Sequence, residues 1–234
     1  MRAKSLLLVL LMPWFIGFTS DENLPPTGDT PVALVKKIVK DVTYKKAGQS
    51  DWEVAKTGDP LFDQGQVKTG SKSLALVLFT DGSGLLRVRE NAVLNIYGKR
   101  NDKQLDKNTY IDKGLIGFEV NKQENAEFKF TTPTAVASIR GTLGFIEVGS
   151  DSSTTISLEK GSVEFQSTRG NKGSGTVTGG NTAKIDLLGN VNLNSATEED
   201  KNKNSTTKQL TTKKVKIKTP QGDIEIEYYS SGNR

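Results

Sequence analysis

Short extended runs, with apolar residues at alternate positions and with glycine-rich turns between them, fill most of this chain. The block from Ala126 to Gln166 is the densest example. Phe128 and Phe130 alternate there with polar neighbours, and Ile156 and Leu158 repeat the pattern. Such alternation is typical of strands with one buried face. Each large apolar side chain buried in this way should contribute about 1.5–3 kcal/mol.

Turn residues divide this block. Pro133 interrupts the first run, because proline has no N–H to give to a strand ladder. Gly141, in the sequence Arg140-Gly141-Thr142, allows a backbone turn that a residue with a β-carbon would resist. Gly161 is predicted to turn the chain again, so that the residues after it pair with the strand before it.

The same organisation extends over residues 32–193, where we count roughly fifteen extended segments. Leu74 to Phe79 is continuously apolar, which predicts burial on both faces. The charged stretch from Lys99 to Lys107 is predicted to be a loop. The spacing between segments is too irregular for a solenoid of fixed period. The predicted fold class is all-β, with many short strands in a sandwich or an irregular β-helix-like body.

Two further segments follow this body. Residues 194–212 are polar, and although Ser195 and Glu198 fit a capping box, no apolar stripe follows them. They are predicted to be a solvated linker. Residues 213–229 alternate cleanly on both sides of Gly222, which predicts a C-terminal β-hairpin. An isolated hairpin is marginal in water, so it should dock on the main sheet or meet a partner.

The N-terminus has the three parts of a secretory signal peptide over residues 1–20: basic residues, a 13-residue apolar run and small residues. Residues 21–31 then read as a linker. The apolar run is shorter than the roughly 20 residues of a spanning helix. An uncleaved anchor is the alternative, because Phe18 disturbs the small-residue cleavage pattern. The prediction is an exported protein of the periplasm or cell envelope, with membrane contact only through such an anchor.

Composition narrows the chemistry. The chain has no cysteine and no histidine, which removes thiol nucleophiles, the usual zinc sites and the commonest general base. We therefore predict no cofactor, no metal and no catalytic residue. Loss of the signal peptide takes two of the five net positive charges with it. The remaining +3 is too mild to argue for nucleic acid.

Several stretches resemble the FecR-type domain, an exported all-β module of bacterial envelopes. They are TGD at 57–59, KTGSKS at 68–73, LVLFTDGS at 76–83, FKFTTPTAVASIRGT at 128–142, LEKGSV at 158–163 and TGGNTA at 178–183. The resemblance covers about residues 32–190. Its signature residues in this chain are Asp81, Gly82, Pro133, Arg140, Gly141, Thr142 and Gly161, which we interpret as structural.

The resemblance implies a periplasmic module that receives a signal from an outer-membrane transducer. The family's namesake also has a cytoplasmic arm that controls a sigma factor. Nothing precedes the signal peptide here, so the chain resembles a stand-alone exported form without that arm.

Two signature positions have an alternative, functional interpretation. Arg140 could present its guanidinium to a carboxylate or phosphate of a ligand, but internal pairing around the Gly141 turn is favoured. Asp81, in Asp81-Gly82-Ser83-Gly84, could bind calcium, but one carboxylate is too few for such a site and a hairpin turn is favoured.

Three functions remain open from the sequence. The first is a non-catalytic envelope module that binds a protein or a cell-wall glycan through sheet edges, loops and the basic C-terminal hairpin. The second is a periplasmic signalling sensor of the FecR regulatory type that acts through a separate membrane protein. The third is a cryptic carbohydrate-active enzyme, because paired carboxylates can hydrolyse glycosides without histidine.

Overall fold

The computed structural model describes residues 30–230 except 102–103, 124–127, 209–210 and 220–221. Seventeen strands and one helix form within this part of the chain, so the all-β prediction is confirmed. Residues 1–29 lie outside the described part, and with them the predicted signal peptide and most of the linker after it.

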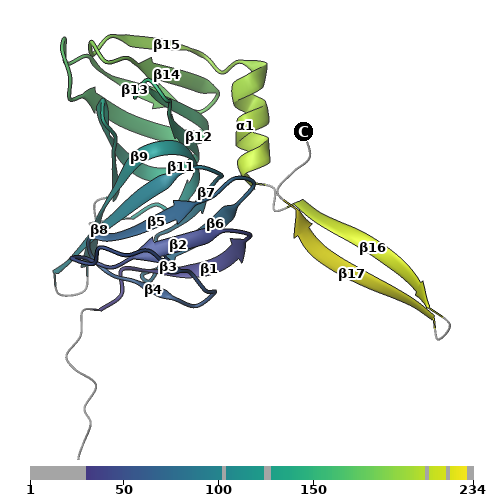
Figure 1. Ribbon diagram of the computed structural model, residues 1–234. Coiled ribbons are helices and arrows are strands. Elements are labelled where there is room, and N and C mark those ends of the chain that lie inside the picture. Colours follow the sequence, from purple (N-terminus) through teal and green to yellow (C-terminus); the bar gives the residue numbers. More distant parts are fainter. Residues whose placement is uncertain (1–29, 102–103, 124–127, 209–210, 220–221, 231–234) are drawn as a thin grey trace, which may run out of the picture.

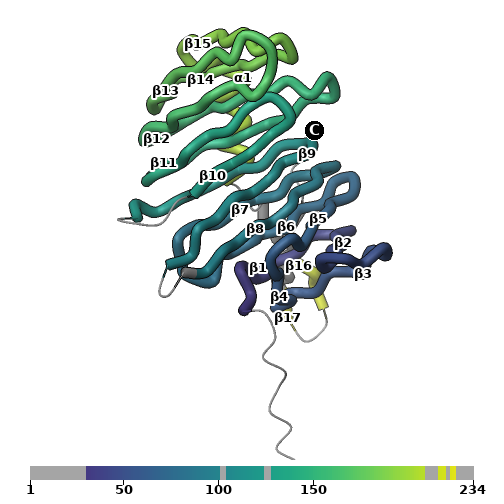
Figure 2. Tube along the Cα trace, turned by 90° about the vertical axis from the view of Figure 1, so that its left-hand side faces the viewer, coloured from purple at the N-terminus to yellow at the C-terminus, as the bar shows by residue number. Residues whose placement is uncertain are grey.

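Most strands belong to one continuous sheet that folds over on itself into two layers (Figures 1 and 2). Some strands lie in the first layer only: β1 (Ala33–Val39), β4 (Pro60–Leu61), β6 (Leu74–Phe79), β7 (Gly84–Val88), β14 (Asn181–Ile185) and β15 (Val191–Ser195). Others lie in the second layer only: β2 (Val42–Lys45), β3 (Glu53–Val54), β5 (Gly65–Thr69), β8 (Val93–Asn101), β10 (Phe128–Thr131) and β13 (Ser174–Thr178).

Three long strands connect the layers: β9 (Gln104–Val120), β11 (Ala135–Val148) and β12 (Thr154–Ser167). The first part of β9 pairs with β8 and β10, whereas its second part pairs with β7 and β11. β11 and β12 stay paired with each other on both sides of their bend. Each of the three strands therefore contributes one half to each layer.

A glycine in the left-handed region marks the bend of each long strand. The φ angles are +94° at Gly114, +66° at Gly141 and +89° at Gly161. Such angles are unfavourable for residues with a β-carbon. The prediction that Gly161 reverses the chain is wrong: β12 runs through it, and the glycine redirects the strand from one layer to the other.

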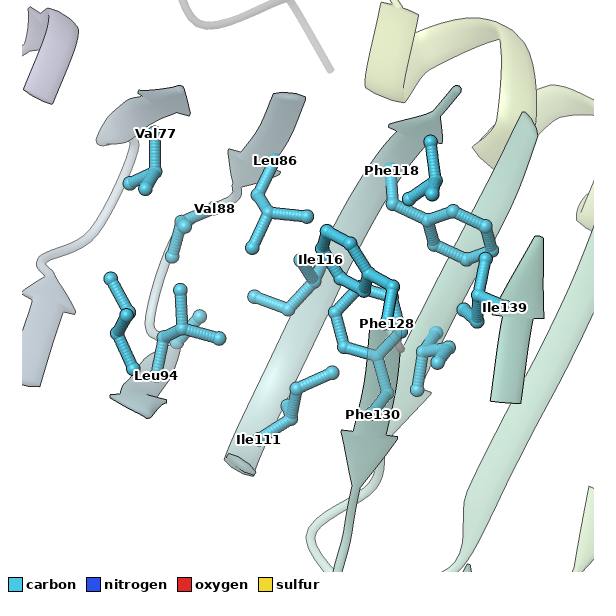
Figure 3. Packing of buried hydrophobic residues seen from close by; sticks show 14 of the residues in the cluster. Val77, Leu86, Val88, Leu94, Ile111, Ile116, Phe118, Phe128, Phe130 and Ile139 are labelled. Atoms are coloured by element: carbon cyan, nitrogen blue, oxygen red, sulfur yellow. The ribbon is translucent and has the colours of Figure 1, made fainter. Parts of the chain in front are cut away.

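The core lies between the layers (Figure 3). The first layer contributes residues such as Leu86, Ile116 and Phe118, and the second contributes Ile111 and Phe130. All five side chains are fully buried. β6 is buried on both faces, as its continuous apolar sequence predicts. The predicted loop from Lys99 to Lys107 is instead the tip of the β8–β9 hairpin, whose ladder continues to Asn101 and Gln104.

Residues Glu198–Lys208 form a helix, α1, so the prediction of a solvated linker is wrong at this point. The cap is also displaced by two residues from the predicted Ser195–Glu198 box. Thr197 accepts a hydrogen bond from the backbone N–H of Asp200 (3.2 Å), and Asp200 accepts one from the backbone N–H of Thr197 (2.9 Å). α1 packs against the outer surface of the first layer, over β9, β11 and β12.

The C-terminal hairpin forms as predicted, from β16 (Thr211–Thr219) and β17 (Gly222–Ser230). It is a separate two-stranded sheet, and Figure 1 shows it extending away from the body. Ile217 faces Ile224 in the register, and the two side chains are 44% and 52% exposed. In the described residues, the hairpin leaves these two apolar side chains in solvent.

Candidate functional site

The turn that carries Asp81 and Gly82 joins β6 to β7. Gly82 has a φ of +69°, and the carboxylate of Asp81 accepts a hydrogen bond from the backbone N–H of Ser83 (3.0 Å). The turn geometry therefore explains why a short acid and a glycine occur together here.

Asp81 also pairs with a lysine that the sequence analysis did not identify. The ammonium of Lys107 is fully buried, forms an ion pair with Asp81, and donates a hydrogen bond to the side-chain oxygen of Gln123 (3.1 Å). It also lies 5.7 Å from the ring centroid of Phe128. An unpaired buried ammonium would cost several kcal/mol, so Asp81 has a structural task that calcium binding would disrupt.

Two opposing effects set the ionisation of Asp81. Burial raises the pKa of its carboxyl group, but the hydrogen bonds from Lys107 and Ser83 lower it by more, so the net pKa is below the ordinary value. The charged form is therefore stabilised in the folded protein. The sequence did not identify Lys107, because a lysine at the end of a charged stretch that is predicted to be a loop is expected to be exposed.

Pro133 lies in the connection between β10 and β11, next to a cluster of buried threonine hydroxyls. Thr154 Oγ1 lies 2.7 Å from Thr132 Oγ1 and 2.6 Å from Thr134 Oγ1. Thr132 also accepts a hydrogen bond from the backbone N–H of Ala135 (2.9 Å). The carbonyl oxygen of Pro133 accepts one from Arg169 Nε (2.9 Å). Residues 131–134 (TTPT) thus connect β10, β11 and the start of β12 through a network of hydrogen bonds.

Arg140, Gly141, Thr142 and Gly161 meet where β11 and β12 bend together. A β-carbon on Gly161 would come within 2.5 Å of the carbonyl oxygen of Gly141 and closer still to the methyl group of Thr142. Thr142 is buried, and within the described residues its hydroxyl has no hydrogen-bond partner. Three of these signature residues therefore form one tightly packed corner.

Arg140 differs from its neighbours at this corner. Its side chain is exposed, and we find no ion pair or hydrogen bond of its guanidinium among the described residues. The predicted internal pairing of Arg140 is thus not seen in this part of the chain, although the predicted backbone bend at Gly141 is.

The outer surface beneath α1 is a second buried region that the sequence analysis did not identify. Gly117 of β9, Phe145 of β11 and Ser157 of β12 lie side by side in register. A β-carbon on Gly117 would lie 2.6 Å from the β-carbon of Thr207, so only glycine lets α1 approach this closely. Asn204 donates a hydrogen bond to the hydroxyl of Ser157 (3.2 Å). Phe145, between the two contacts, is fully buried.

Polar contacts hold α1 in place. Thr182 Oγ1 lies 3.1 Å from a carboxylate oxygen of Asp200 and 2.9 Å from Ser157 Oγ. Lys203 forms an ion pair with Glu147 of β11 (2.8 Å). Burial raises the pKa of Asp200, but hydrogen bonds from Thr197 and Thr182 lower it by more, and the net pKa is below the ordinary value.

No feature of the described residues suggests a metal centre, since no group of three or more acidic side chains lies close enough to share an ion. The glycine-rich stretch at 170–176 runs from the connection between β12 and β13 into β13 itself, without the helix that a phosphate-binding loop requires. Within the described residues, α1 is the only helix, and it is too short and too polar to cross a membrane.

Comparison with known proteins agrees with this description. Residues 65–164 match the family described as FecR protein, so the resemblance seen in the sequence is confirmed over this stretch. The matched region runs from β5 into β12 and includes every signature residue. Comparison with curated proteins gave no match.

Two crystal structures of a protein described as a "putative anti-sigma factor" from Parabacteroides distasonis are similar in part. Each has 14% sequence identity and a TM-score of 0.48 to this chain. The similarity covers 56% of this chain and 59% of the other. The chain therefore spans less than two thirds of the length of these similar proteins.

Proposed function

We propose that this protein is a non-enzymatic signalling module of the FecR type, exported to the bacterial envelope, where it acts by contacting a separate membrane protein. The FecR domain at residues 65–164 is the observation that carries the proposal. The signature residues of that domain are used in turns, corners and a buried ion pair, which suits a scaffold better than a catalytic centre.

The C-terminal hairpin is the proposed contact with the partner. Ile217 and Ile224 lie opposite each other and about half exposed, so a partner that covers them gains apolar burial. The outer edges of β16 and β17 also offer backbone groups for strand addition.

The experiment replaces both isoleucines with lysine in the full-length protein. Cross-linking in whole cells should then capture the partner several-fold less, and genes controlled through it should change expression as they do in a deletion strain. Lys216→Ala, on the opposite face of β16, is the matched control and should leave both readouts unchanged. Undiminished cross-linking by the double variant, with normal gene expression, would rule out the hairpin as the contact.

Export is a separate part of the proposal, with its own measurement. Intact mass of the purified protein should show loss of about the first 20 residues, as signal peptides require. Retention of Met1–Ser20 by a membrane-bound form would instead support the uncleaved anchor.

A second candidate function is binding of a cell-wall glycan. A shallow hollow of about 290 Å³ is lined by Asp63, Tyr97, Asp106 and Asn108, and Tyr97 is 40% exposed. An exposed aromatic ring beside carboxylate and amide groups is the kind of surface that orients a polar ligand. Retention on purified peptidoglycan that falls with Tyr97→Ala, and is unaffected by the hairpin variant, would favour this function.

A further inference from the structure

The two ends of the strand stack differ in how their edges are protected. At one end, β3 and β4 have only two residues each, and Pro60 in β4 has no N–H to offer. Very short strands and proline are the usual means by which proteins block edge pairing. The opposite end is formed by β15 in the first layer and β13 in the second, each with five residues and without proline.

β15 has an unusually neutral sequence for this chain. Residues 187–197 contain no charged side chain, although a quarter of all residues in the chain are charged. Lysine and other charged side chains on an edge strand oppose pairing with a second strand. β15 has neither a proline nor a charged side chain that would oppose such pairing.

The backbone groups on the outer edge of β15 can be assigned from its pairing with β14. Asn190 and Ala196 make backbone hydrogen bonds towards β14, to Asp186 and Gly180. Hydrogen-bonded and non-hydrogen-bonded pairs alternate in an antiparallel ladder. The N–H and C=O groups of Val191, Leu193 and Ser195 therefore point outwards, where no described strand pairs with them.

An apolar side chain is also left open at this edge. Leu193 lies opposite Ala183, whose side chain is fully buried in the core, so Leu193 is on the core-facing side of the sheet. Its side chain is nevertheless 48% exposed, because the first layer ends at β15. A strand added at this edge would cover it.

We propose that β15 pairs antiparallel with β15 of a second copy of this chain, about a two-fold axis at Leu193. This register places Leu193 opposite its own counterpart, Val191 opposite Ser195, and Asn192 opposite Asn194. The outward N–H and C=O groups of Val191, Leu193 and Ser195 then bond to their equivalents in the second copy.

Self-complementarity favours a second copy over an unrelated strand. At a two-fold axis any charged residue faces its own like charge, and this edge carries none. Asn194 already donates its side-chain N–H to the side-chain oxygen of Asn192 (2.6 Å). This bond does not use the side-chain N–H groups of Asn192 or the side-chain oxygen of Asn194, so these groups are left to bond across the interface.

Cysteine cross-linking tests this register, because the chain has no cysteine of its own. Facing hydrogen-bonded residues of an antiparallel pair have Cα atoms about 5.5 Å apart, which lies within the range for a disulfide. The full-length Leu193→Cys variant should therefore form a covalent dimer on mild oxidation in dilute solution. Leu188→Cys should not, although Leu188 is 67% exposed, because the two copies of residue 188 would lie roughly 30 Å apart.

Charge exchange provides a second test that does not depend on oxidation. Leu193→Lys and Leu193→Glu should each sediment as monomers, because each places like charges together at the axis. A mixture of the two variants should restore the dimer, and the unaltered protein should also dimerise. A monomeric unaltered protein, equal cross-linking by Leu193→Cys and Leu188→Cys, or cross-links from Cys variants to a different protein alone would each overturn the proposal.

Discussion

The inner and outer faces of the same three strands are both buried, but by different means. On the inner face, Ile116, Ile146 and Ile156 lie in one row across β9, β11 and β12, and all are fully buried in the core. On the outer face, one residue along each strand, the corresponding row is Gly117, Phe145 and Ser157, covered by α1.

The difference shows that burial need not follow from an apolar sequence. The inner row is stabilised by removal of isoleucine side chains from water, at about 25 cal/mol per Å². The outer row is covered by a helix whose buried residues are Asp200, Asn204 and Thr207. That contact depends on close approach at Gly117 and on satisfied hydrogen bonds, so we expect it to be weaker and more sensitive to conditions than the core.

The largest effect should come from the inner row. Ile146→Ala removes the central side chain of three and should lower the free energy of unfolding by about 2–5 kcal/mol. Urea unfolding followed by tryptophan fluorescence measures it. The body and α1 should unfold together in this variant; a loss below about 1 kcal/mol would mean that the row contributes much less than its burial indicates.

The second largest loss of stability is expected at Gly141 and Gly161, the glycines where β11 and β12 bend. Gly161→Ala combines a positive φ with collisions against Thr142 and Gly141, and should cost about 3 kcal/mol. Gly141→Ala is the matched control, because a β-carbon there would come no closer than 3.4 Å to any neighbour. Only its φ is unfavourable, at a cost of about 1 kcal/mol. Equal losses in thermal unfolding would contradict the steric explanation.

On the outer face, Gly117→Ala should destabilise the packing of α1 without destabilising the core. The new β-carbon would collide with Thr207 and displace α1, whereas alanine is favoured over glycine in a strand by roughly 0.5–1 kcal/mol. Hydrogen exchange of the α1 amides should accelerate at least tenfold while the core amides keep their protection. If core protection fell together with that of α1, the two faces would form one cooperative unit.

Acid should also act on the outer face first. Because the pKa of Asp200 is lowered in the folded protein, its contribution is fully present above the unfolded value, near 3.9, and is lost as the pH falls through the lower folded value. Helical circular dichroism should therefore decrease on acidification below about pH 4. Asp200→Asn should loosen α1 already at neutral pH and flatten this transition.

Asp81 titrates in the same direction but belongs to the body, so the two carboxylates need separate readouts. Hydrogen exchange of α1 amides reports on Asp200, and global unfolding reports on Asp81. An unchanged acid transition of α1 in Asp200→Asn would assign the pH dependence to another group.

The smallest effect is expected at Arg140. The side chain is exposed and pairs with nothing in the described residues, so Arg140→Ala should change stability by no more than about 0.5 kcal/mol. A thermal shift as large as that of Gly141→Ala would show that the guanidinium has a structural partner after all.

Much of the inner face was predictable, because alternation reports directly on a half-buried strand. The burial of β6 on both faces was predicted from the continuously apolar sequence of Leu74 to Phe79, and the C-terminal hairpin was predicted from the alternation over residues 213–229. The bend at Gly141 was also predicted. Gly161 was wrongly predicted to reverse the chain. A glycine with positive φ can occur in the turn of a hairpin or at the bend of a long strand, and the local sequence is similar in both cases.

The outer face was not predictable in this way. Nothing in the sequence EEDKNKNSTTK has the apolar stripe of a packed helix, and its mean hydropathy indicates solvent. Lys107 and Asp81 are likewise 26 residues apart, and only the pairing of β9 with its neighbours brings them together. Contacts between polar groups depend on the distance between the two groups and on their orientation in the folded chain, and a pattern of residue types along the sequence contains neither.

The sequence by itself determined the all-β class, several of the turns and most of the core, because apolar alternation and glycine act over a few residues. Only the tertiary structure decided that three long strands bend between two layers, that a polar helix covers Phe145, and that no described strand pairs with the outer edge of β15. Those features depend on which strands lie beside one another, and that arrangement is determined by contacts between residues far apart in the chain.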